Sequence, residues 1–225
     1  MGTAVQRACQ DAKAKLIRRA ASSLGVPEEE VEYRERRLQV KGDPSRYVSL
    51  RDLARASITT AEGAIVGTGA ITRPRLAPTL AAHVVDVEVD PETGKVTVLS
   101  YAAVQDVGFT MNPRLVEGQI QGAVVHGIGW ALSEGYVFES GVLQNASLLD
   151  YRLPTAVDVP MIDVSLVEVP AEGFYGVRGV GEPPIIPPPA AIANAIYAAV
   201  GVRLKELPMT PEAVFWALRA REQER

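Results

Sequence analysis

The sequence has very few of the side chains that bind metals or form covalent cross-links. Its 225 residues include a single cysteine, Cys9, and two histidines, His83 and His126. One cysteine cannot form an intrachain disulfide, and so few ligands cannot build a zinc site or an iron–sulfur cluster. We therefore expect no metal ion to be held by the side chains of this chain.

Long apolar runs and a strong excess of one charge are also missing. No stretch approaches the roughly 20 apolar residues that span a bilayer, and the first residues do not form a signal-peptide core. The net charge is −4, and no stripe of lysine and arginine marks a nucleic-acid surface. The sequence predicts a cytoplasmic protein without a membrane span and without nucleic acid as a partner.

What the chain does contain is enough apolar residues for a core, since 47% of it is hydrophobic. Helix and strand patterns interleave without the regular alternation of a doubly wound sheet, so we predict an α+β fold of mixed hairpins and helices. Residues 1–60 are predicted to form a helix, a small hairpin and a short helix. Residues 61–225 are predicted to form the main α+β part, and we expect the two parts to make one compact unit.

The first 24 residues predict a long amphipathic helix. Their apolar side chains recur at intervals of three and four, and Gly25 is placed to end the helix. Cys9 lies on the apolar stripe, so we expect a core thiol rather than a reactive one. The glycines of residues 61–80 fit no nucleotide-binding fingerprint, and we interpret this stretch as a connection.

Residues 81–105 carry the clearest strand signal in the chain. Apolar and polar residues alternate on both sides of a turn sequence, which predicts a hairpin of two long strands. A second hairpin is predicted around residues 139–141, and residues 162–169 alternate as a further strand. Two helices are predicted towards the end of the chain, over residues 190–200 and 211–221.

A helix predicted over residues 113–132 is unusual because it contains four glycines, Gly118, Gly122, Gly127 and Gly129. A glycine in a helix interior costs about 1 kcal/mol relative to alanine, so each one needs a reason. Either the helix is buried and packs closely against other backbone, or a large ligand lies against it. The residue pattern leaves both interpretations open.

A glycine-rich loop near the end of the chain reads Gly-Val-Arg-Gly-Val-Gly-Glu-Pro-Pro and carries one carboxylate, Glu182. Gly176, Gly179 and Gly181 allow positive φ and a close approach of the backbone to another body. Pro183 is expected to hold Glu182 in extended geometry. The loop is either a surface turn with a solvated glutamate or a rigid support that aims this carboxylate.

Three groups of short motifs stand out in the second half of the chain. They are Asp-Val-Gly at 106–108 with Asn-Pro at 112–113; Val-Glu-Gly-Gln-Ile at 116–120 leading to Gly-Ile-Gly at 127–129; and Gly-Val-Gly-Glu at 179–182 followed by residues 190–195 and 207–212. In order and spacing they resemble the carboxy-terminal part of the large subunit of the molybdenum hydroxylases. That family includes xanthine dehydrogenases, aldehyde oxidases and oxidoreductases, carbon monoxide dehydrogenases and 4-hydroxybenzoyl-CoA reductases.

The resemblance covers nearly the whole chain and implies the second type of molybdenum-cofactor-binding domain. It implies that Glu182 is the general base beside a molybdenum held by a pyranopterin. The base takes a proton from the water-derived oxygen that is transferred to an aldehyde, an N-heterocycle or a related small substrate. Burial is expected to tune this carboxylate for its task. The cofactor-binding residues implied by the resemblance are Gln119, Gly118, Gly122, Gly179 and Gly181.

The family's large subunits are several times longer than this chain, so the resemblance implies that the chain holds only part of an active site. We expect the amino-terminal half of the large subunit to supply the rest, either because the subunit is split or because the chain is a truncated product. Electron transfer from molybdenum would further require iron–sulfur and flavin subunits. The expected cofactor is molybdopterin, with the cytosine dinucleotide as one form, shared with the partner polypeptide.

Two functions are compatible with these observations. The first is a component of a molybdenum-dependent oxidoreductase that is inactive alone, and the second is a non-catalytic folded remnant or assembly module. Arg178 stands where the family commonly has lysine or arginine, and two roles for it stay open: a positive charge near the loop or the substrate, and a surface ion pair.

Overall fold

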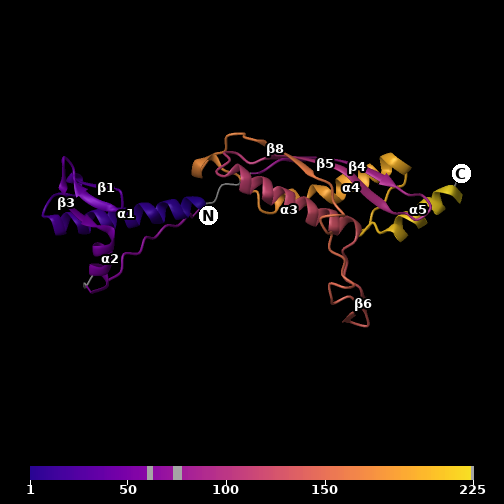
Figure 1. The fold of residues 1–225 in the computed structure, drawn as a ribbon, viewed down its shortest axis with the longest axis horizontal. Coiled ribbons are helices and arrows are strands. Elements are labelled where there is room, and N and C mark those ends of the chain that lie inside the picture. The colour runs from indigo at the N-terminus through magenta and orange to yellow at the C-terminus, as the bar shows by residue number, and fades with distance from the viewer. Residues whose placement is uncertain (60–62, 73–77, 224–225) are drawn as a thin grey trace. The chain divides into compact units, whose positions relative to one another are not determined.

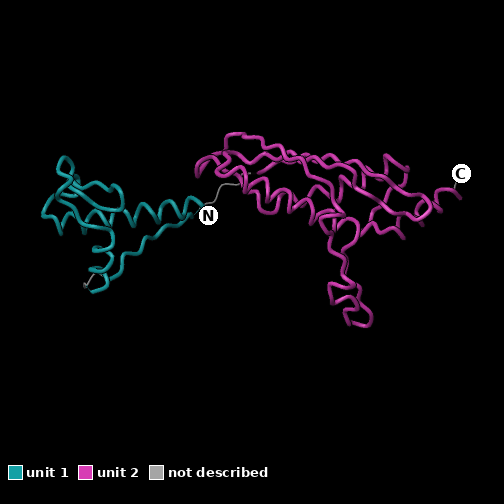
Figure 2. Tube along the Cα trace, viewed as in Figure 1, with its two compact units in different colours: residues 1–75 teal, residues 76–225 magenta. Residues whose placement is uncertain are grey.

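The computed structural model describes residues 1–59, 63–72 and 78–223 (Figure 1). The chain forms two compact units, Met1–Arg75 and Leu76–Arg225 (Figure 2). The predicted division at residue 60, and the expectation that both parts form one unit of a larger subunit, stay predictions. Among the described residues, no helix combines the length and apolar character needed to cross a membrane.

The first unit is a small sheet with a helix on either side of it in sequence. Its elements are α1 (Gly2–Leu24), the short helix η1 (Glu28–Glu30), β1 (Val31–Arg34), β2 (Arg37–Val40), β3 (Asp43–Ser49) and α2 (Leu50–Thr59). The three strands form an antiparallel sheet in the order β1-β2-β3. The predicted helix and hairpin are confirmed, whereas β3, which is mostly exposed, was not predicted.

The core of this unit lies at the carboxyl end of α1. Ala20 and Ala21 are buried there together with Val31, Leu38 and Leu53 from the sheet and α2. The amino-terminal half of α1 is far more open, and Cys9 is exposed. The prediction of a core thiol is therefore wrong: the apolar stripe continues along α1, but the sheet packs only against its last turns.

Residues 63–72 have no regular secondary structure and run along the amino-terminal half of α1. A Cβ placed on Gly67 or on Gly69 would collide with the helix backbone, so only glycine allows this approach. Asp11 fixes the contact, because its Oδ2 accepts hydrogen bonds from Thr68 N at 2.8 Å and from Lys15 Nζ at 2.9 Å. These contacts, first of all the hydrogen bond from Lys15, lower the pKa of Asp11 to about 2.

We predict that acid releases this segment from α1. A carboxylate whose pKa is depressed on folding contributes stability above its ordinary pKa of 3.8, and the contribution is lost as the pH falls towards 2. The Thr68 amide resonance, followed by NMR, is expected to titrate with a midpoint of about 2. In the Asp11→Asn variant the titration should disappear, and a midpoint near 4 in the native chain would contradict the assigned contact.

The second unit is built on a three-stranded sheet covered on one face by helices. Its elements are β4 (Ala81–Val89), β5 (Val96–Asp106), α3 (Pro113–Leu132), β6 (Phe138–Glu139), β7 (Val142–Leu143), β8 (Ile162–Val167), η2 (Phe174–Gly176), η3 (Pro183–Ile185), α4 (Pro187–Val200) and α5 (Pro211–Gln223). The sheet order is β4-β5-β8, with β5 antiparallel to β4 and parallel to β8. The predicted hairpins, strand and helices are all present, and α4 begins three residues earlier than expected because its first turn accepts prolines.

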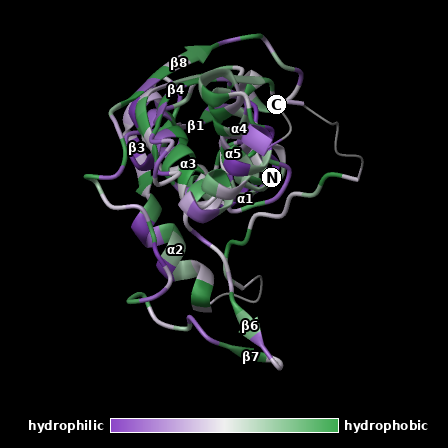
Figure 3. Cartoon of the chain, turned by 90° about the vertical axis from the view of Figure 1, so that its right-hand side faces the viewer, coloured by the Kyte–Doolittle hydropathy of each residue, from purple (hydrophilic) through white to green (hydrophobic). Residues whose placement is uncertain are grey.

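Tyr101 from β5, Ile120 and Val124 from α3, and Ile192 and Ile196 from α4 share one buried cluster, so both helices pack on the same face of the sheet. The hairpin of β6 and β7 stands away from this body (Figure 3). α3 therefore has one side in the core and one side free to receive other groups.

Candidate functional site

The loop that carries Glu182 is attached by its backbone to the chain that leaves β5. Phe109 N donates to Gly176 O and Arg178 N donates to Val107 O, each at 2.9 Å. These two bonds form an isolated antiparallel β-bridge between Gly108 and Val177. The loop therefore starts from a fixed point at the end of β5 and then runs towards α4.

The backbone of the loop differs from the sequence prediction at two places. Of its three glycines only Gly176 has a positive φ, at 72°. Glu182 has φ −107° and ψ −27° and precedes η3, so the predicted extended geometry is wrong. The reason is that Ile185 N donates to Glu182 O at 3.0 Å, and this turn stabilises a conformation that a following proline disfavours.

One hydrogen bond joins the glycine-bearing helix to the glutamate loop. Gln119 Nε2 on α3 donates to Gly181 O at 3.0 Å, although 62 positions separate the two residues. Gly118 and Gly122 are one helical turn apart on the same side of α3 and are exposed. The structure thus brings Gln119 and the residue before Glu182 together at this helix face.

The four glycines of α3 fall into two pairs with different surroundings. A Cβ on Gly127 would lie 2.6 Å from Pro188, and a Cβ on Gly129 would collide with Glu134 and Pro154, so these two permit close packing within the unit. Gly118 and Gly122 have no atom within 4 Å of such a Cβ. Close packing therefore explains Gly127 and Gly129, whereas a ligand against Gly118 and Gly122 stays a prediction.

Gly179 and Gly181 resemble Gly118 and Gly122 in having free space where a side chain would be. The hydrogen bond between Gln119 and Gly181 links the two glycine pairs, and we call Gly118, Gly122, Gly179, Gly181 and Gln119 together the open glycine face. Such a surface can accept a large planar group against the main chain, because no Cβ keeps the group at a distance. The predicted cofactor-binding residues fit a pterin in this respect.

Glu182 is exposed in this chain. The burial that we expected around the carboxylate is not provided by the residues that the structure describes, because the loop lies at the surface of its unit. Throughout the described ranges, no three histidine, cysteine, aspartate or glutamate side chains gather as possible metal ligands.

The second unit also has a cavity of about 700 Å³, but it lies elsewhere. It opens near the carboxyl end of α3, and Leu132, Tyr151 and Met209 are among the residues that line it. Neither Glu182 nor any residue of the open glycine face lines this cavity. Tyr151 donates a hydrogen bond to the buried Glu134 at 2.8 Å, which raises the pKa of Tyr151 to about 12. The candidate site is thus an open surface rather than an enclosed pocket of this chain.

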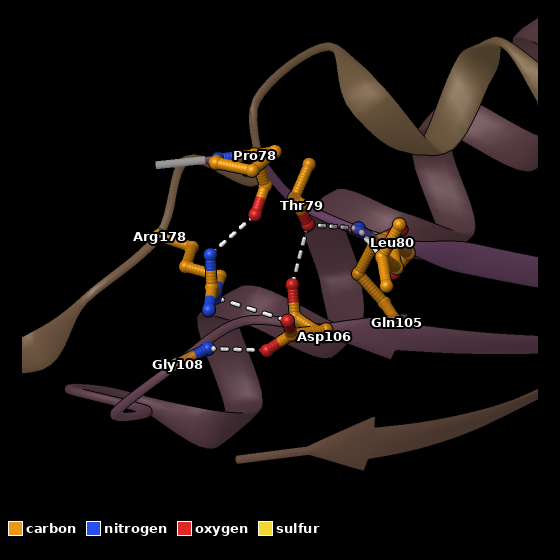
Figure 4. A network of polar contacts seen from close by, with 7 residues as sticks. All are labelled: Pro78, Thr79, Leu80, Gln105, Asp106, Gly108 and Arg178. Carbon is orange, nitrogen blue, oxygen red and sulfur yellow. Dashed lines mark hydrogen bonds and ion pairs between the residues drawn. The ribbon is translucent and has the colours of Figure 1, made fainter. Parts of the chain in front are cut away.

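The side chain of Arg178 is largely enclosed and contacts Asp106 and Pro78. Its side chain is 13% exposed, and its Nε lies 3.0 Å from Oδ2 of Asp106, whose side chain is 9% exposed (Figure 4). Of the two roles left open for Arg178, the structure shows the ion pair, but the pair is largely enclosed rather than at the surface. The sequence pointed to Asp106 only through the Asp-Val-Gly motif, and the position of this residue at a strand end is the signal for a structural role.

Residues 1–160 match the family model of the molybdopterin cofactor-binding domain. The chain belongs to this family. The resemblance to the large subunits of molybdenum hydroxylases is confirmed, and so is the prediction of an α+β molybdopterin cofactor-binding domain.

Individual relatives agree with the family assignment. The chain is 39% identical over 173 residues to the putative xanthine dehydrogenase molybdenum-binding subunit XdhA of Escherichia coli, covering 75% of this chain and 23% of that protein. It is 36% identical over 230 residues to the nicotine 6-hydroxylase large subunit of Paenarthrobacter nicotinovorans, covering 97% of this chain and 28% of that protein.

Solved structures give the same result for the fold of this molybdopterin cofactor-binding domain. The reconstituted CO dehydrogenase from Oligotropha carboxidovorans matches with a TM-score of 0.72 and 25% identity, over 97% of this chain and 28% of that one. The chain spans about a quarter of the length of the curated relatives it matches. The two matches that cover 97% of this chain include the glutamate loop, whereas the family model ends before it, at residue 160.

Proposed function

We propose that the chain is the carboxy-terminal molybdopterin-binding component of a molybdenum hydroxylase, with Glu182 as its general base. The observation that carries the proposal is the hydrogen bond from Gln119 to Gly181, because it joins the helix part of the open glycine face to its loop part, directly before Glu182. A cofactor lying on that face would be within reach of a carboxylate on the adjoining loop. The name molybdenum-binding subunit belongs to the relative from Escherichia coli and supports the same role here.

When bound, a molybdenum pyranopterin supplies the redox chemistry that transfers water-derived oxygen to an aldehyde, an N-heterocycle or a related small substrate. The chain's own contribution is a base and its support. A Glu182 oxygen accepts the proton of the oxygen nucleophile, which requires an approach to hydrogen-bond distance. Gln119 holds the loop through Gly181, and Gly118, Gly122 and Gly179 let the pterin lie close to the backbone.

Because Glu182 is exposed, the exclusion of water from the site has to come from outside this chain. We propose that a partner polypeptide equivalent to the amino-terminal half of the large subunit covers the open glycine face and shares the cofactor. Iron–sulfur and flavin subunits would then accept the electrons. The chain alone is proposed to be inactive, and its cytoplasmic location stays a prediction.

Capture of the chain from its native source tests this proposal. The complex is expected to contain a second, molybdopterin-binding polypeptide and bound pterin, with the cytosine dinucleotide as one form to examine. If the chain purified alone bound molybdopterin tightly, the claim that it holds only part of a site would be wrong. If the captured chain carried neither partner nor pterin, a non-catalytic remnant would be the better description.

A further inference from the structure

The start of the glutamate loop is fixed at one buried point, four residues before Glu182. Arg178 and Asp106 meet there with 3.0 Å between Nε and Oδ2 (Figure 4). Nε donates no hydrogen bond, so this contact is an electrostatic ion pair. Because both side chains are almost fully enclosed, water screens this attraction far less than it would on the surface.

Asp106 is itself held in place by the surrounding backbone. Its Oδ1 accepts from Gly108 N at 3.0 Å, and its main-chain oxygen accepts from the hydroxyl of Thr79. Gln105 donates to the same hydroxyl at 2.7 Å. The carboxylate is therefore a fixed point at the end of β5.

The guanidinium of Arg178 makes a second contact, in which it donates to Pro78 O. A single side chain thus ties the loop to the end of β5 and to the residues that lead into β4. Further along the loop, Gly179 and Gly181 have no neighbour within 4 Å of a Cβ. Backbone bonds at both ends of the loop and the packing of Val180 against the core also hold it. The described side chains that reach its polar backbone or ends are Asp106, through its ion pair with Arg178, and Gln119, through its bond to Gly181.

We propose that Asp106 and Arg178 are a positioning pair for the carboxylate of Glu182. The pair does not touch the reacting groups; it sets the direction in which the loop leaves the sheet. This inference rests on the proposed role of Glu182, but the pair's effect on the loop is measurable without any catalysis.

Hydrogen exchange on the full chain tests the pair directly. In Asp106→Asn the shape of the side chain and its oxygen for Gly108 are kept while the charge is lost. We expect the amides of residues 176–178, which donate hydrogen bonds in the native loop, to exchange about tenfold faster or more, whereas those of residues 86–98 stay unchanged. Arg178→Lys keeps the charge and should restore part of the protection that Arg178→Gln loses. Arg219→Gln, which removes an exposed partner of Glu222, is the control and should leave the loop unchanged.

Three results would overturn the positioning role. They are unchanged exchange of residues 176–178 in Asp106→Asn, equal acceleration throughout residues 78–223, and equal losses in Arg178→Lys and Arg178→Gln. In the captured complex, assayed with an aldehyde or N-heterocycle that the native complex oxidises, Asp106→Asn should lower kcat with KM and molybdenum content unchanged. If Asp106→Asn accelerated exchange in the loop but the native complex showed no measurable turnover, the positioning role of the pair would be supported. The same result would count against Glu182 as a base.

Discussion

Replacing Glu182 with glutamine is expected to lower the turnover of the assembled enzyme by about 10²- to 10⁴-fold, the usual contribution of a positioned general base. Glutamine has nearly the same shape as glutamate but cannot accept a proton at neutral pH. The backbone of the loop should be unaffected, because its described contacts involve the main chain, Gln119 and Arg178. The measurement is kcat on a substrate found by screening aldehydes and N-heterocycles with the native complex.

Molybdenum content decides how a loss of turnover is interpreted. The Glu182→Gln complex should retain the molybdenum of the native complex, so that the lost activity reflects lost proton transfer. Glu206→Gln, which changes an exposed carboxylate before α5, should keep full activity. Full turnover in the Glu182→Gln complex would show that another group is the base.

Replacing Gly122 with leucine is expected to remove most of the bound molybdopterin from the complex while the chain stays folded. Apart from the adjoining residues and the backbone of α3 itself, no described atom lies within 4 Å of a Cβ at this position, so a larger side chain starts out into open space. It would instead occupy the space in which we place the cofactor. The measurement is the pterin released per complex, compared with the native complex, and we expect a loss of about tenfold or more, since a tenfold loss corresponds to only 1.4 kcal/mol of binding.

Two alanine variants separate cofactor binding from folding. Gly122→Ala should raise the free energy of unfolding of the chain by roughly 0.5–1 kcal/mol, because alanine favours the helix and fits the free space. Gly127→Ala should lower it by about 1–3 kcal/mol, since its Cβ would lie 2.6 Å from Pro188. Full retention of pterin by Gly122→Leu would mean that the cofactor does not use this face.

Local signals in the sequence predicted the boundaries of many elements. Asn112 caps α3 by accepting from Leu115 N, and Gly25 and Gly201 end their helices with φ of 66° and 70°. Each of these depends on a few neighbouring residues, so a pattern read along the chain is sufficient. The long hairpin of β4 and β5 was predicted for the same reason.

Features that depend on distant parts of the chain could not be obtained in this way. Cys9 follows the helical period, yet it is exposed because nothing in the described chain packs against it. Gly118 and Gly127 look equivalent in the sequence, and only the position of Pro188 distinguishes them. The conformation of Glu182 depends on the turn that follows it rather than on the proline alone.

The candidate site shows the same division. The motifs of a known family indicated Glu182 and Gln119, but no periodicity could show that Gln119 reaches Gly181 across 62 positions. Arg178 was recognised as a charge near the loop, while its burial against Asp106 required the strand end to be in place. The contact partners of Gln119 and Arg178 are far away in the sequence, so they can be identified from the fold but not from the spacing of residues along the chain.

Our central proposal is that this chain holds molybdopterin together with a partner polypeptide. The most direct measurement is the molybdenum content of the complex captured through this chain from its native source. We predict molybdenum in an equimolar amount to the chain, with the pterin lost when the partner is removed. A stable complex that contains the partner but no molybdenum or pterin would contradict the claim.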